Sequence, residues 1–157
     1  MTTPEPTIVT LAPVRAAVVE GTGVPMTAIR DFFDSSFQLL GAAVAQQGVA
    51  PGTAAFARYV GQPTDTVDLA VGFGVGPEFV ATEEVSVMEI PGVRAGQLVH
   101  VGGYDTLGTS WDRLVGWLQG QGEPLADWFL EEYLTEPVPG ADPADMRTRL
   151  SYPLATG

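Results

Sequence analysis

The chain has 157 residues, a length that suits a single domain able to bury its own core. Its net charge is −12, and all 7 basic residues are arginines, so repulsion from phosphate argues against direct binding of nucleic acid. Cysteine is absent, which excludes disulfides, thiolate catalysis and cysteine-ligated metals. Neither a signal-peptide pattern nor a run of about 20 apolar residues occurs, so we expect a cytoplasmic protein without membrane contact.

The first half is predicted to contain extended segments and one helix. The predicted order is strand, helix, strand, strand, over residues 7–20, 25–47, 53–60 and 66–75. Pro13 interrupts the first strand or lies at an edge, because proline cannot donate to a strand ladder. Residues 21–23 are expected to form a turn, and Pro25 suits the first helical position. Gly48 is expected to end the helix.

The second half shows the same order of elements. We expect a short strand over residues 85–89, a turn or bulge at residues 91–92, a strand over 93–101, a helix after Gly103, and strands over 128–135 and 146–154. Apolar residues at helical spacing form one stripe of the helix: Leu107, Trp111, Leu114 and Leu118. Gly120 and Gly122 are expected to end this helix.

Similar sequences also recur between the two halves. Val14-Arg15-Ala16 recurs as Val93-Arg94-Ala95, and at the same spacing Phe32 matches Trp111. We therefore predict one domain over residues 1–157, of class α+β, built from two pseudo-symmetric strand-helix-strand-strand repeats at about 7–76 and 83–154. The strands are expected to form an antiparallel sheet with both helices on one face. A cleft between the repeats is a natural ligand pocket.

Residues 128–134 contain the strongest candidate for chemistry. Side chains two apart in a strand share a face, so Phe129, Glu131 and Tyr133 are expected to point one way. The matching face of the first half carries small residues and Tyr59. A carboxylate in such an aromatic-lined space suits a lipophilic cation, and its burial raises the carboxyl pKa, which is a route to acid–base catalysis. The alternative is a solvated glutamate on an exposed face.

His100 is the single histidine, and a packed strand position is its expected role. Without cysteine or a second histidine it has no obvious metal-binding partners. No nucleophile elbow accompanies it. We therefore expect neither a metal site nor a cofactor.

Four stretches of the second half resemble the gyrase-inhibitor-like (GyrI-like) effector-binding domains. They are the turn at residues 100–104, the Leu-x-x-Trp-Leu pattern at 114–118, the Glu-x-Tyr-Leu strand at 131–137, and the Tyr-Pro-Leu strand at 151–154. Gly103 stands where that family commonly has proline, and Leu130 where it often has arginine. The first half is less typical of the family.

The resemblance implies a pocket between two repeats, with Glu131 as its carboxylate. It implies binding of lipophilic, often cationic, compounds, as in the sensor parts of AraC-type and MerR-type transcription regulators. The leading prediction is a stand-alone small-molecule-binding domain, more a multidrug binder than an enzyme. The predicted ligand-binding residues are Glu131, Tyr133, Tyr59, Trp111, Phe33, Phe73 and Tyr152.

Two alternatives stay open. Certain relatives resemble hydrolases of cyclopropane-bearing genotoxins, in which case Glu131 and Tyr133 would be catalytic. Other relatives counter gyrase-directed toxins, which implies a protein partner and a stable complex that survives pocket mutations. Turnover lost in Glu131→Gln distinguishes the hydrolase from the binding domain.

Overall fold

The computed structural model describes residues 5–52, 54–61, 64–103, 106–134, 142 and 146–155. Three sequence predictions fall partly outside these residues: the start of the strand over 53–60, the end of the turn over 100–104, and the end of the strand over 128–135. The chain divides into two compact units. We call Ala12–Gly92 the N-terminal unit, and Met1–Leu11 with Val93–Gly157 the C-terminal unit.

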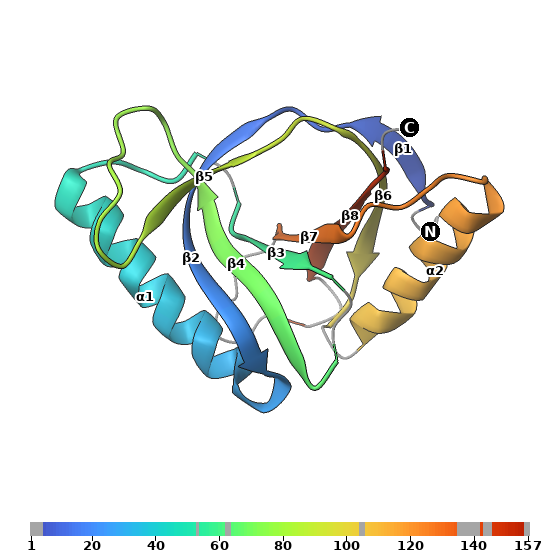
Figure 1. Cartoon of the computed structure of the whole chain (residues 1–157), viewed down its shortest axis with the longest axis horizontal. Helices are drawn as coiled ribbons and strands as arrows, with labels where there is room; N and C mark the ends of the chain where they lie inside the picture. Colours follow the sequence, from blue (N-terminus) through green and yellow to red (C-terminus); the bar gives the residue numbers. More distant parts are fainter. Residues whose placement is uncertain are drawn as a thin grey trace. The chain divides into compact units, whose positions relative to one another are not determined.

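The N-terminal unit consists of four antiparallel strands and one long helix. The strand order is β3-β4-β2-β5, with β2 at Val14–Pro25, β3 at Phe56–Val60, β4 at Thr66–Gly74 and β5 at Ser86–Ile90. Helix α1, Ile29–Gln47, packs along β2 and β4 (Figure 1). It ends at Gly48, whose φ of 67° is left-handed, as expected for a glycine that terminates a helix.

Two sequence predictions for this unit are wrong. Residues 21–23 do not form a turn, because β2 continues to Pro25 with a shift of register between Gly21 and Val24. The bulge keeps the strand paired while changing its direction. Pro25 is not the first residue of the α-helix either, because its ψ of 139° is extended and a 3₁₀ turn, Met26–Ala28, comes before α1.

The C-terminal unit also has four antiparallel strands and one helix. The strand order is β1-β6-β8-β7, with β1 at Thr7–Thr10, β6 at Arg94–Val101, β7 at Trp128–Tyr133 and β8 at Arg147–Pro153. Helix α2, Leu107–Gly120, packs on β6 and β8 (Figure 1). Its predicted stripe is the core, since Leu114 and Leu118 are fully buried against Leu98 and Leu150.

The extended segment predicted over residues 7–20, with an interruption or an edge at Pro13, forms two strands in different units. Strand β1 pairs with β6, whereas β2 begins at Val14, after the break around Pro13. The prediction of antiparallel α+β architecture is confirmed, with each helix on its own unit's strands. Within the described parts of the chain, neither helix is long and apolar enough to span a membrane.

Candidate functional site

Glu131 lies in the interior of the C-terminal unit. In the antiparallel register of β7, β8 and β6, Glu131 is opposite Leu150, and Leu150 is opposite Leu98. Both leucines pack against α2, so the Glu131 side chain is on the helix-covered face. Only 7% of Glu131 is exposed. Of the two adjacent glutamates, Glu131 is therefore the one that shares a face with the apolar core of this unit.

Two side chains donate hydrogen bonds to the two oxygens of this carboxylate. The Trp111 indole N–H donates to Oε2 over 2.8 Å, and the Tyr133 hydroxyl donates to Oε1 over 3.0 Å. Such bonds offset part of the large cost of taking a carboxylate out of water. They also fix the orientation of the carboxylate, because one donor comes from α2 and the other from β7 itself.

Aromatic rings surround the carboxylate on the same face. The Trp111 ring meets Phe129 edge-on at a centroid distance of 4.9 Å and Tyr152 edge-on at 6.1 Å. Phe129 and Tyr152 are stacked at 5.5 Å. Trp111, Phe129 and Tyr133 are only half-buried. We call Glu131, Tyr133, Trp111, Phe129 and Tyr152 the Glu131 cluster.

The adjacent Glu132 has a different environment. It points to the opposite face of β7, where its carboxylate pairs with Arg149 over 3.1 Å. Its side chain is 24% exposed. The two neighbouring glutamates thus provide a matched pair, one inside among aromatic rings and one outside in an ion pair.

His100 holds the start of α2 to the end of β6. It is 5% exposed, and its Nδ1 lies 2.6 Å from the Ser110 hydroxyl. Its Nε2 lies 2.9 Å from the Gly103 carbonyl, which requires the proton to be on Nε2 because a carbonyl can only accept. Nδ1 then accepts from Ser110. This arrangement is structural, as expected for a packed strand histidine.

Thr148 lies between His100 and Tyr133 in the strand register. The threonine is fully buried, and its hydroxyl has no hydrogen-bond partner within the described structure. A buried hydroxyl without a partner is uncommon in proteins and destabilises the fold.

The remaining predicted ligand residues belong to the N-terminal unit. Tyr59 and Phe73 are on the α1-facing side of β3 and β4 and are buried, with 9% and 7% of their surface exposed. Phe33 lies on α1, with its ring 6.5 Å from that of Phe32 and 6.4 Å from that of Phe37. The structure therefore brings Glu131, Tyr133, Trp111 and Tyr152 together in the C-terminal unit. Tyr59, Phe33 and Phe73 lie in the N-terminal unit.

Phe129 was not among the predicted ligand residues, although it packs on both Trp111 and Tyr152. Its position two residues before Glu131 on the same strand was the available signal, because this spacing puts it on the same face.

The sequence as a whole decides the family. The profile of the GyrI-like small molecule binding domain matches residues 4–155. The chain belongs to the GyrI-like family. The GyrI-like match spans both units, so the similarity carried by the motifs of the second half extends over nearly the whole chain. Among curated protein sequences, none is significantly similar to the chain.

Solved structures share the fold of this GyrI-like chain at low sequence identity. The C-terminal domain of EcmrR has a TM-score of 0.84 and 16% identity, with 98% of this chain and 99% of that one covered. EcmrR in its complex with DNA gives a TM-score of 0.83 and 17% identity, and there the match covers 98% of this chain and 58% of the EcmrR chain.

Two further structures have similar folds: one is described as a hydrolase, and the other was solved with a bound ligand. A hydrolase encoded by lin2189 from Listeria innocua has a TM-score of 0.66 and 15% identity, with coverage of 98% and 93% of the two chains. SAV2435, solved bound to tetraphenylphosphonium, has a TM-score of 0.69 and 12% identity, with coverage of 96% and 94%. At these identities the likeness establishes the fold alone.

Proposed function

We propose that this GyrI-like domain binds lipophilic organic cations, and that the Glu131 cluster is the binding site. The observation that carries the proposal is the position of Glu131, a 7% exposed carboxylate held by Trp111 and Tyr133 among aromatic rings. A carboxylate in this setting attracts a cation by charge, and the ring faces add cation–π attraction. A cation with aromatic substituents also gains by burying apolar surface against Phe129 and Tyr152.

The structure of SAV2435 bound to tetraphenylphosphonium supports the choice of ligand class, because that compound is a lipophilic cation. The fold shared with the EcmrR C-terminal domain supports a role in effector binding linked to transcription. The chain's net charge of −12 disfavours direct DNA contact, so we propose that any such role passes through a protein partner. A cytoplasmic location remains a prediction from the sequence.

Hydrolysis is the second candidate, because the lin2189 protein of similar fold is described as a hydrolase. Within the cluster, Glu131 and the hydroxyls of Tyr133 and Tyr152 are the groups that could transfer a proton, and the family resemblance assigns that role to Glu131 and Tyr133. Binding is favoured because the hydrogen bonds from Trp111 and Tyr133 stabilise the charged form of the carboxylate, and this form is the one that pairs with a cation. Product formed in molar excess over enzyme, and lost in Glu131→Gln, is the signature of hydrolysis.

Tetraphenylphosphonium titration, followed by tryptophan fluorescence and by calorimetry, tests the binding proposal. We expect saturable binding to the wild type, and affinity about tenfold weaker or worse in Glu131→Gln, which keeps the size of the side chain and removes its charge. The matched control is Glu132→Gln, because that residue is adjacent but on the opposite face. Triphenylphosphine oxide, a neutral analogue, is expected to bind weakly to all three proteins. Equal affinity of wild type and Glu131→Gln would remove the carboxylate from the proposal.

The sequence also predicts Tyr59, Phe33 and Phe73 as ligand-binding residues, and we keep this as a separate proposal. Substitution of Tyr59 by leucine tests it, since leucine preserves an apolar side chain while removing the ring. Weaker tetraphenylphosphonium binding in Tyr59→Leu, with unchanged thermal stability, would support a contribution of the N-terminal unit to the same ligand. Unchanged affinity would restrict the site to the Glu131 cluster.

A further inference from the structure

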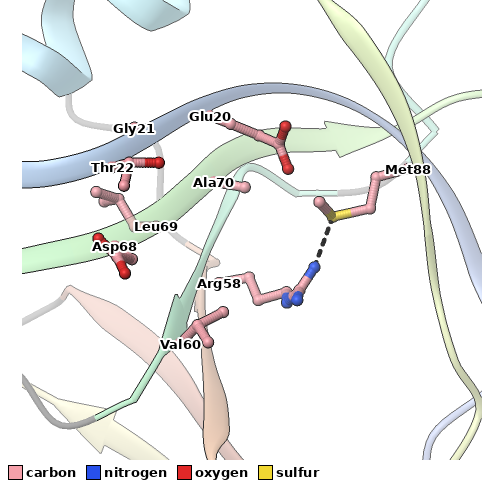
Figure 2. Close-up of a pocket in the computed structure, with 9 residues that line it drawn as sticks. All are labelled: Glu20, Gly21, Thr22, Arg58, Val60, Asp68, Leu69, Ala70 and Met88. Atoms are coloured by element: carbon pink, nitrogen blue, oxygen red, sulfur yellow. Dashed lines mark hydrogen bonds between the residues drawn. The ribbon is translucent and has the colours of Figure 1, made fainter.

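The N-terminal unit contains a cavity on the face of its strands that is opposite α1. The cavity has a volume of about 160 Å³ and is lined by residues of β2, β3, β4 and β5 (Figure 2). Gly21 faces α1, since a Cβ there would lie 2.7 Å from the Phe32 ring. The neighbouring Glu20 therefore points to the other face, into the cavity. We call this feature the Ala70 cavity, because Ala70 is at its centre.

The strand register explains why a cavity forms here. Glu20 on β2 and Arg58 on β3 are both directly opposite Ala70 on β4. Their Cα atoms are therefore two strand spacings apart, about 10 Å. The single methyl group of Ala70 leaves the space between the two long charged side chains unfilled. Figure 2 shows the Arg58 guanidinium ending beside the Met88 sulfur.

The charged groups that line the cavity are held by neighbouring atoms. The Arg58 guanidinium contacts the Met88 sulfur over 3.0 Å. Asp68 accepts a hydrogen bond from the Gly23 backbone N–H over 2.7 Å, so the bulge in β2 fixes this second carboxylate. A cavity with one guanidinium and two carboxylates offers partners for both an anionic and a cationic group. The apolar side chains that line the cavity on this face are Val60 and Met88.

The C-terminal unit shows what happens when the central position carries a large side chain. There Glu132 on β7 is directly opposite Arg149 on β8, and the two form an ion pair over 3.1 Å. In the N-terminal unit the corresponding neighbour of Arg58 on the central strand is Ala70. Glu132 and Arg149 are thus on adjacent strands in one unit, whereas Glu20 and Arg58 are on either side of Ala70 in the other.

We propose that the Ala70 cavity binds a small zwitterion of the ω-amino acid class. The ammonium group pairs with Glu20, the carboxylate pairs with the Arg58 guanidinium, and the short alkyl chain crosses Ala70 against Val60. A guanidinium binds a carboxylate well because its planar N–H groups match the two oxygens. The second carboxylate, Asp68, makes the cavity net negative and so favours a ligand with an amine. The site shares no residue with the Glu131 cluster, and the proposal does not depend on the proposed cation site.

Titration of the ¹⁵N-labelled full chain by NMR tests this site directly. The probes are glycine, γ-aminobutyrate and 6-aminohexanoate, with n-butylamine and butyrate as analogues that carry one charge each. We expect saturable amide shifts at residues 20–22, 58–60 and 68–70 with γ-aminobutyrate or 6-aminohexanoate. We also expect these probes to bind about threefold to fivefold more tightly than either single-charge analogue, because each end gains one partly exposed ion pair.

Variants connect any binding to the proposed geometry. Glu20→Gln should remove the tighter binding of the zwitterion relative to butyrate, which lacks the ammonium group. Arg58→Gln should remove its tighter binding relative to n-butylamine, which lacks the carboxylate. Ala70→Leu fills the hollow and should abolish binding; should that variant fail to fold, Glu20→Gln still tests the site because Glu20 is exposed. Glu84→Gln is the control, as an exposed carboxylate outside the cavity. Absence of saturable shifts, equal binding of the single-charge analogues, or binding unaffected by Glu20→Gln would each overturn the proposal.

Discussion

Trp111 on α2 donates its indole N–H to Glu131 on β7 over 2.8 Å, which joins the helix to the strand that carries the buried carboxylate. The same indole packs edge-on against Phe129, at 4.9 Å, and against Tyr152, at 6.1 Å. Trp111 therefore has two separable roles: hydrogen bonding to a charge and aromatic packing. Substitutions that keep one role and remove the other can tell them apart.

Trp111→Phe retains an aromatic ring but removes the N–H donor. We expect the free energy of unfolding to fall by about 2–3 kcal/mol, since a hydrogen bond to a charged group is lost in the interior. Urea denaturation followed by circular dichroism measures this change. Trp117→Phe is the control, because Trp117 is half-buried on the same helix and packs against the same core. An equal loss in both variants would mean that ring size, rather than the bond to Glu131, accounts for the effect.

Tyr133→Phe removes the second donor to Glu131, the hydroxyl at 3.0 Å. We expect a loss of about 1–2 kcal/mol in unfolding free energy, because the phenyl ring remains in place. A double-mutant cycle with Glu131→Gln tests whether the loss passes through the carboxylate. In the Glu131→Gln background the cost of Tyr133→Phe should fall below about 0.5 kcal/mol. Additive losses would show that Tyr133 acts independently of Glu131.

The members of the Glu131 cluster on β7 follow from the sequence by simple periodicity. Alternation along the strand puts Phe129, Glu131 and Tyr133 on one face, and the helical stripe puts Trp111 on the face that covers them. The contact between Trp111 and Glu131 could not be derived in this way. It depends on how far along β7 the helix lies, which is set by packing between elements distant in the sequence.

The pairing of strands also could not be predicted from residue patterns within single segments. The sequence predicted an extended segment over residues 7–20 that Pro13 interrupts or places at an edge. It did not predict that β1 pairs with β6 while β2 pairs with β4 and β5. The Ala70 cavity could not be predicted from the sequence for a similar reason. Glu20 and Arg58 are far apart in the chain, and only the register of three strands places both opposite the same alanine.

Thr148→Val is expected to stabilise the protein. The threonine hydroxyl is fully buried without a hydrogen-bond partner, so replacing it by a methyl group of similar shape removes an uncompensated polar group. We expect an increase of about 1 kcal/mol in unfolding free energy, measured by urea denaturation. Ser151→Ala is the contrasting variant, because that buried hydroxyl accepts a hydrogen bond from Gln97 over 3.2 Å and its removal should destabilise. Loss of stability in Thr148→Val would indicate that its hydroxyl has a partner after all, such as an internal water.

Gly96→Ala and Gly116→Ala should change stability in opposite directions. A Cβ at Gly96 on β6 would lie 2.5 Å from the side chain of Leu118, which is fully buried under α2. Overpacking of this kind costs about 1–3 kcal/mol, because the leucine or the helix must move. A Cβ at Gly116, on the exposed side of α2, would meet nothing within 4 Å. There alanine should stabilise by up to about 1 kcal/mol through its better helix propensity. Thermal unfolding of both variants measures the difference, and a neutral Gly96→Ala would mean that α2 lies farther from β6 than the structure places it.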